Sequence, residues 1–205
     1  MIYNFYLGWI TEMRTKKILL LLSNGFEILE ASSFIDVMGW NLEEGDYSTK
    51  LYSCGLRKEL KSSFGQKFIV DFLLNEIDVD SFDALVVPGG FKNFGYYKDA
   101  YSIEFLELIR NFRNKNKIIA SVCVGALPLA KSGILKNKNA ITYNQIDYRK
   151  TLENYEVNLL ENPIVKDDNL ITSNGPSTAL DVAFILLEAL SSKENSLKVR
   201  NLMGF

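Results

Sequence analysis

Continuous apolar runs alternate with amphipathic stretches along most of the chain. Short apolar runs are typical of strands buried on both faces of a sheet, and apolar residues at helical spacing are typical of helices packed on it. Strands are predicted at residues 17–23, 47–53, 66–70, 82–87, 117–122 and 140–142, and a hairpin at 162–173. Helices are predicted at residues 27–40, 100–114, 123–131, 179–190 and 193–205. A strand, a glycine turn and then a helix open a doubly wound α/β fold, in which ligands bind beyond the carboxyl ends of the strands.

The first part of the chain differs from the rest. Residues 1–16 are rich in aromatic side chains, and they lack the cationic start and apolar core of a signal peptide. We therefore predict an N-terminal extension at 1–16, followed by one domain at 17–205. The longest apolar run, residues 18–22, is far too short to span a bilayer, so no membrane association is expected.

Composition removes several classes of function. A net charge of −2 gives no electrostatic reason to expect nucleic acid as a partner. The two cysteines, Cys54 and Cys123, form no CxxC pair, and this sparse use predicts free thiols in a reducing, cytoplasmic compartment. No dinucleotide or P-loop fingerprint occurs, and no metal-ligand pattern occurs, so no cofactor or metal is expected.

The chain contains no histidine. A Cys–His or Ser–His catalytic pair therefore cannot form within it, and neither can a zinc site built on imidazole. Any general base must be a carboxylate, a lysine, a tyrosine, the thiolate itself or water.

Cys123 lies where a predicted strand gives way to a helix, two residues before Gly125. A nucleophile on such a sharp turn needs small neighbours, because the strand and the helix approach closely there. The free N–H groups at the start of the helix favour a thiolate. The alternative is a buried structural cysteine, which is common in protein cores.

Four motifs, taken together in this order and spacing, resemble the ThiJ/PfpI superfamily. This class I glutamine-amidotransferase-like group includes protein deglycase and the intracellular protease PfpI. The motifs are residues 24–30 (NGFEILE), 87–90 (VPGG), 120–125 (ASVCVG) and 173–178 (SNGPST). The resemblance covers about residues 17–205. It implies a flavodoxin-like α/β/α sandwich with a nucleophile elbow, and usually a homodimer.

The resemblance also implies a site. Its catalytic residues are Cys123 as the nucleophile and Glu30 as the carboxyl partner, and burial beside a thiolate would keep Glu30 protonated. Many members of the family place a histidine where this chain has Asn144, and asparagine cannot accept a proton near neutral pH. The oxyanion site and pocket implied by the motifs comprise Gly89, Gly90, Val124, Asn144, Asn174 and Pro176.

Three functions remain open at this point. The first is a cysteine-dependent enzyme acting on a small electrophile, either like a glyoxalase or deglycase or like an isonitrile hydratase. The second is a sensor of oxidative stress, whose Cys123 is oxidised reversibly. The third is a non-catalytic protein that binds small molecules. The missing histidine argues against a peptidase, so the partner is expected to be a small-molecule substrate or an oxidant.

Overall fold

The computed structural model describes residues 14–205. The strands are β1 (Lys16–Leu21), β2 (Thr49–Gly55), β3 (Glu59–Lys61), β4 (Lys67–Ile69), β5 (Phe72–Leu73), β6 (Ala84–Val87), β7 (Ile118–Val122), β8 (Asn139–Ala140), β9 (Asn158–Leu159), β10 (Ile164–Asp167) and β11 (Leu170–Ser173). The α-helices are α1 (Ile28–Glu44), α2 (Tyr96–Ala100), α3 (Ile103–Asn114), α4 (Ala126–Lys131), α5 (Ile146–Asn154), α6 (Ala179–Leu190) and α7 (Lys193–Leu202). The predicted extension lies outside the described residues, except for its last three.

A seven-stranded sheet forms the centre of the molecule, with the strand order β10-β11-β7-β6-β1-β2-β5. Strand β10 pairs antiparallel with β11, and every other neighbouring pair is parallel. The hairpin β3–β4 and the pair β8–β9 form two small additional sheets. The predicted flavodoxin-like architecture with a mostly parallel, doubly wound sheet is confirmed.

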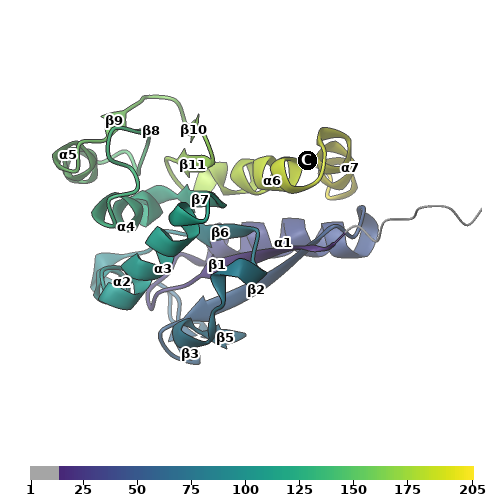
Figure 1. The fold of residues 1–205 in the computed structure, drawn as a ribbon, viewed down its shortest axis with the longest axis horizontal. Coiled ribbons are helices and arrows are strands. Elements are labelled where there is room, and N and C mark those ends of the chain that lie inside the picture. Colours follow the sequence, from purple (N-terminus) through teal and green to yellow (C-terminus); the bar gives the residue numbers. More distant parts are fainter. Residues whose placement is uncertain (1–13) are drawn as a thin grey trace, which may run out of the picture.

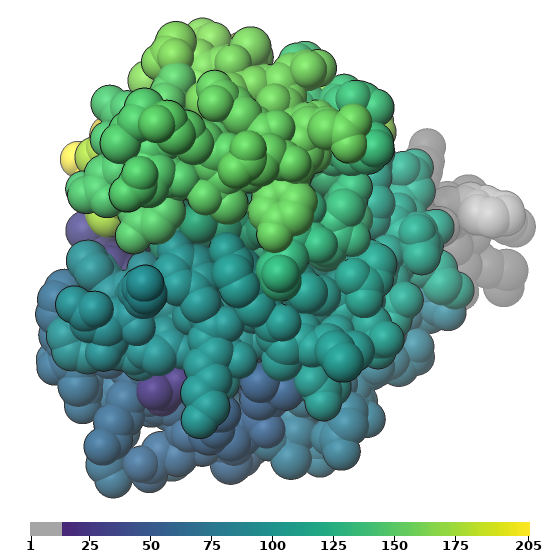
Figure 2. Space-filling view, turned by 90° about the vertical axis from the view of Figure 1, so that its left-hand side faces the viewer, coloured from purple at the N-terminus to yellow at the C-terminus, as the bar shows by residue number. Residues whose placement is uncertain are grey.

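Helices cover both faces of this sheet. Because successive strand residues point to opposite faces, Ile18 and Leu20 of β1 pack with residues of α1 and α6, whereas Leu19 and Leu21 pack with residues of α3 and α4. Figure 1 shows the resulting layers, with α1, α6 and α7 on one side and α2, α3 and α4 on the other. Figure 2 looks onto the surface built by the middle of the chain.

Three helices differ from the sequence-based expectation. The short helix α2 ends at Ala100, where the predicted helix begins, and was not predicted. Helix α1 continues to Glu44, because Asn41 is buried and donates a hydrogen bond to Thr49 at 2.8 Å, although it is not apolar. Helix α5 was not predicted at all. Only Leu152 of its nine residues is buried, so it carries no apolar stripe that a periodicity argument can detect.

The parallel strands direct their carboxyl ends to one edge of the sheet. The segments that follow β1, β6, β7 and β11 therefore meet there, and they contain the four sequence motifs. Within residues 14–205, no helix has the length and apolar content needed to cross a membrane.

Candidate active site

Cys123 stands on a strained turn directly after β7. Its φ is +57°, a value that few residues other than glycine adopt. Gly125 permits the turn, because a Cβ at that position would lie 2.3 Å from the carbonyl oxygen of Val87. The Thr142 hydroxyl donates a hydrogen bond to the Cys123 carbonyl at 3.0 Å. The geometry is that of a nucleophile elbow, with the thiol half-buried at the edge of the sheet.

Glu30, in the first turn of α1, is completely buried. Its Oε2 accepts a hydrogen bond of 2.6 Å from the Gly89 N–H. Its other oxygen, Oε1, is buried and has no hydrogen-bond partner among the described residues. A buried polar atom left without a partner is costly, and a catalytic role is one reason for a structure to retain it.

Backbone hydrogen bonds join the loop after β1 to the loop after β6. The Glu27 N–H donates to the Gly89 carbonyl at 2.9 Å, and the Phe91 N–H donates to the Gly25 carbonyl at 3.1 Å. Gly90 allows this close approach, since a Cβ there would lie 2.3 Å from the Gly25 oxygen. The two loops therefore form one rigid unit that places Glu30 against Gly89.

An ion pair between the buried Asp99 carboxylate and the exposed Arg57 guanidinium supports the same unit. Asp99 accepts two hydrogen bonds from the Arg57 guanidinium, at 2.6 and 2.9 Å, and a third from the Asn24 N–H at 2.8 Å. Asp99 is almost fully buried, so the bidentate partner offsets the cost of removing its charge from water.

Burial controls the protonation of both reactive groups. It raises the pKa of Glu30 to about 8, against the opposing effect of the Gly89 N–H, and the nearby Glu27 carboxylate adds to the rise. Burial also raises the pKa of the Cys123 thiol above its ordinary range, and the Glu30 carboxyl adds to that rise, while the Val124 N–H opposes it. The sequence led us to expect a stabilised thiolate. The shift has the opposite direction, because burial outweighs the single N–H donor.

A cavity of about 220 Å³ opens beside this pair of side chains. It is lined by Glu27, Glu30, Gly90, Phe91, Cys123, Val124, Tyr143, Gln145, Tyr148 and Pro176. Apart from the two carboxyl groups, the thiol and the Gln145 amide, its wall is mainly aromatic and aliphatic. It has the mixed apolar and polar character of a small-molecule site.

The cavity brings together most of the residues expected from the sequence. Cys123, Glu30, Gly90, Val124 and Pro176 line it. Three expected pocket residues do not line it. The Gly89 N–H donates its hydrogen bond to Glu30, and Asn144 and Asn174 are not among the lining residues.

Asn144 is exposed to solvent, and its neighbour Tyr143 faces the cavity in its place. Four further lining residues were not expected from the sequence and are Glu27, Phe91, Gln145 and Tyr148. Glu27 had been interpreted as complementing the helix N-terminus. It does cap α1, accepting a 2.9 Å hydrogen bond from the Glu30 N–H, and it also lines the cavity.

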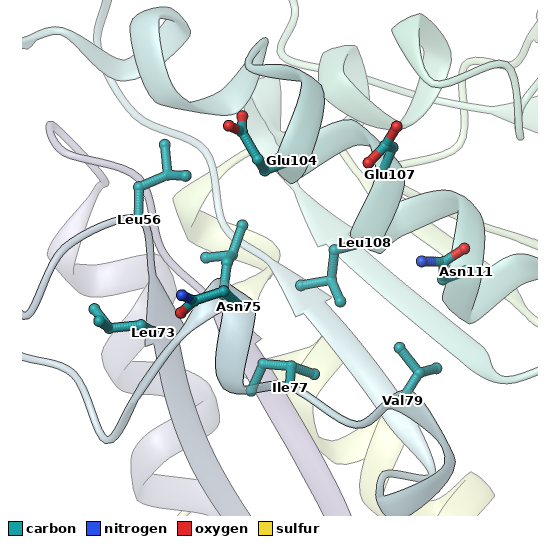
Figure 3. Close-up of a pocket in the computed structure, with 10 residues that line it drawn as sticks. Leu56, Leu73, Asn75, Ile77, Val79, Glu104, Glu107, Leu108 and Asn111 are labelled. Carbon is teal, nitrogen blue, oxygen red and sulfur yellow. The ribbon is translucent and has the colours of Figure 1, made fainter.

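A second hollow, of about 450 Å³, lies between residues 73–79 and helix α3. Figure 3 shows aliphatic side chains of this segment facing α3, whose Leu108 points toward them. Its lining contains Glu104 and Glu107 but no nucleophile. In the described part of the chain, no three His, Cys, Asp or Glu side chains are grouped as metal ligands. The reactive chemistry is therefore concentrated in the cavity at Cys123.

Comparison with known proteins identifies the family. A sequence model described as the DJ-1/PfpI family matches residues 16–189. The chain belongs to the DJ-1/PfpI family. This confirms the resemblance to the ThiJ/PfpI superfamily that the four motifs indicated.

Individual members of the DJ-1/PfpI family match most of the chain. Protein DJ-1 homolog B of Arabidopsis thaliana is 29% identical over 186 residues, which are 90% of this chain but 40% of that protein. Protein dj-1beta of Drosophila melanogaster is 28% identical, covering 88% of this chain and 92% of its own. The chain thus spans less than half the length of the Arabidopsis relative and nearly all of the Drosophila one.

Solved structures of the DJ-1/PfpI family have the same fold. The crystal structure of Drosophila melanogaster DJ-1beta superimposes with a TM-score of 0.81 at 28% identity, covering 92% of this chain and 97% of that one. A ThiJ/PfpI family protein from Pseudomonas syringae gives a TM-score of 0.83 at 22% identity, covering 94% and 76%. The second likeness supports the fold alone.

The raised pKa of Glu30 predicts a particular dependence of stability on pH. The unfolded chain releases this proton near pH 4.5, whereas the folded protein keeps it up to about pH 8. Stability supplied by the protonated group is complete below pH 4.5 and is lost as the pH rises toward 8. Relative to Glu30→Gln, the free energy of unfolding should therefore fall by about 1.4 kcal/mol per pH unit across this interval.

Urea unfolding of both proteins at several pH values measures this difference. Glu43→Gln is the matched control, because Glu43 is an exposed carboxyl near the other end of α1, and its curve should run parallel to that of the native protein. Parallel curves for Glu30→Gln as well would show that Glu30 ionises normally in the folded state.

Proposed function

We propose that this protein is a cysteine-dependent enzyme that acts on a small electrophile, either a 2-oxoaldehyde or an isonitrile. The observation that carries the proposal is the pairing of Cys123, on a strained elbow, with a completely buried carboxyl, Glu30, in one small cavity. A strained nucleophile and a carboxyl with a strongly shifted pKa are together typical of catalytic sites.

The chemistry begins with the transfer of one proton. When Glu30 is ionised it accepts the thiol proton, and the Cys123 sulfur then adds to the aldehyde carbon of a 2-oxoaldehyde. A C–S bond forms and the carbonyl electron pair moves to oxygen, which takes the proton back from Glu30. The product is a hemithioacetal. The C1 proton then moves to C2 and the C1 hydroxyl proton moves to the C2 oxygen, which gives a thioester. Water hydrolyses the thioester to the 2-hydroxy acid and the free thiol.

An isonitrile would react with the same two side chains, Cys123 as the nucleophile and Glu30 as the proton carrier. The sulfur adds to the terminal carbon, which takes the proton from Glu30, and a thioimidate results. Water then displaces the thiol and leaves an N-substituted formamide. Neither route needs an imidazole, which suits a chain without histidine. A peptidase is less well supported, because no histidine is present to protonate a leaving amine.

Turnover and thiol reactivity test the proposal together. Cys123→Ser should lose at least about a hundredfold in the rate of 2-hydroxy acid or formamide formation, because serine is a far weaker nucleophile here. The alkylation rate of Cys123 by iodoacetamide should rise with pH through a midpoint near 8, where Glu30 ionises and can accept the thiol proton. Glu30→Gln should slow alkylation and abolish that midpoint.

Cys54 is the other cysteine of the chain, and it is fully buried. Any alkylation of Cys54 is measured separately in Cys123→Ser and subtracted. Equal turnover by the native protein and Cys123→Ser would refute the enzymatic proposal for that substrate. If Cys123 is alkylated slowly, and its alkylation rate shows no midpoint near pH 8, the result would favour the non-catalytic binding function.

A sensor of oxidative stress is the second candidate function, and one observation favours it. Within residues 14–205, Glu30 Oε1 is buried without a hydrogen-bond partner, and Glu30 lines the same cavity as Cys123. A protonated Glu30 can donate a hydrogen bond to an oxygen added to that sulfur. Oxidation by peroxide converts the thiol to a sulfenic acid and releases water.

Intact-mass analysis after mild peroxide treatment tests this candidate. Native protein should gain one or two oxygen atoms, located at Cys123 by peptide mapping. Glu30→Gln should gain them several-fold more slowly or lose the singly oxidised form sooner. An unchanged mass, or oxygen found at other residues, would rule the sensor out.

We also propose that the protein forms a homodimer in a reducing, cytoplasmic compartment. Both cysteines are free, as that compartment predicts. Phe64, Phe91 and Phe94 contact one another on the surface and are 59%, 48% and 47% exposed. An exposed aromatic cluster of this kind supports an interface with a second copy.

Light scattering on a sizing column gives the oligomeric state directly. The native protein should have twice the mass of one chain, and Phe64→Ser should shift it toward the monomer. Ile103→Ser removes another exposed apolar side chain, at the start of α3, and should leave the mass unchanged. A native monomer would contradict the dimer without affecting the enzymatic proposal.

A further inference from the structure

The cavity at Cys123 is lined by acidic side chains and by no basic ones among the described residues. Its lining contains two carboxyl groups, Glu27 and Glu30, and no lysine or arginine among the described residues. The chain has no histidine that can supply a positive charge there. An anionic ligand in this cavity would meet no opposite charge.

Glu27 also removes the positive field that the start of a helix normally provides. The N-terminus of the 17-residue helix α1 points toward the site and would attract an anion. The Glu27 carboxylate already occupies this position, accepting the Glu30 N–H at 2.9 Å. Its negative charge acts on both reactive groups, since it contributes to the raised pKa of Glu30 and of Cys123.

The rest of the wall is suited to an apolar, planar group. Tyr143 and Tyr148 contact each other with ring centroids 6.3 Å apart, and Phe91 packs against Phe64 at 5.8 Å. Tyr143, Tyr148 and Phe91 line the cavity together with Val124 and Pro176. Its volume of about 220 Å³ exceeds the roughly 150 Å³ that suffices to hold benzene in an apolar cavity.

We infer that the site selects neutral electrophiles that carry an aromatic or similarly bulky apolar group, and that Glu27 is the residue that excludes anionic ones. This inference rests on the proposed function, because it assigns the class of substrate to the same cavity. Aryl 2-oxoaldehydes and aryl isonitriles fit it, whereas 2-oxo acids and phosphorylated aldehydes do not. The Gln145 amide is a neutral polar group of the wall that can donate a hydrogen bond to the substrate carbonyl.

Alkylation of Cys123 tests the selectivity without requiring turnover. Iodoacetamide and iodoacetate have nearly the same shape and differ in charge at pH 7. In both reactions a C–S bond forms, iodide leaves and the thiol proton is lost. The ratio of the alkylation rate with iodoacetamide to that with iodoacetate is measured for Cys123 and for N-acetylcysteine. The variant Cys123→Ser measures any contribution from Cys54.

We expect the Cys123 ratio to favour iodoacetamide by about tenfold more than the ratio for N-acetylcysteine, because the anion must approach the Glu27 carboxylate in a partly desolvated cavity. Glu27→Gln should remove most of this discrimination. Glu43→Gln makes the same change of net charge on an exposed part of α1 and should retain it. Equal ratios for Cys123 and N-acetylcysteine, or full discrimination in Glu27→Gln, would overturn the assignment to Glu27.

N-phenyl iodoacetamide tests the inferred preference for substrates that carry an aromatic group. Its rate relative to iodoacetamide should be several-fold higher at Cys123 than at N-acetylcysteine, and Phe91→Ala should reduce that gain. Phe91 is half-exposed, so this variant should keep the fold. No gain in the native protein would refute the aromatic preference. Selectivity without turnover of any candidate substrate would instead refute the proposed enzymatic function and leave the inference about the cavity intact.

Discussion

The hydrogen bond from the Gly89 N–H to the Glu30 carboxyl is the interaction on which the site depends. It joins the first turn of α1 to the loop after β6, and it holds the completely buried Glu30 side chain in place. A carboxyl in such surroundings cannot ionise cheaply, so its proton is retained well above the usual range of pH. The surrounding fold must supply the free energy that this burial costs.

That free energy comes from an ordinary α/β core. Strand β1 is buried on both faces, and its parallel pairing with β6 holds the two loops next to each other. The hydrogen bonds between the loops, and the Asp99–Arg57 pair, leave the loops little freedom to relax away from Glu30. The strained backbone of Cys123 is retained for the same reason, because Gly125 and Thr142 fix the chain on either side of the turn.

The negative charge of Glu27 affects both the protonation of Glu30 and Cys123 and the charge of the ligand that the cavity can bind. Glu27 disfavours a second negative charge, whether that charge is on Glu30, on the Cys123 sulfur or on a ligand. The same carboxylate therefore adds to the effect of burial in keeping the resting pair neutral, and it makes the cavity unsuitable for anions. The aromatic side chains then provide most of the surface that a neutral ligand can contact.

The sequence by itself predicted most strands of the sheet, the α/β class, the elbow at Cys123 and the family, because buried strands and tight turns need particular residues at short spacing. The two-residue strand β5 was missed, since it is too short to form such a pattern. The resemblance of the sequence motifs to the family also predicted Glu30 as the partner of Cys123. Only the tertiary structure decided how these groups ionise, since burial arises from packing between distant segments and outweighs the local effect of the helix start. It alone also showed that Gly89 holds Glu30, that Asn144 faces solvent, and that Glu27, Phe91 and Tyr148 share one cavity. These three side chains come from separate loops and helices, and only the pairing of parallel strands brings their positions together.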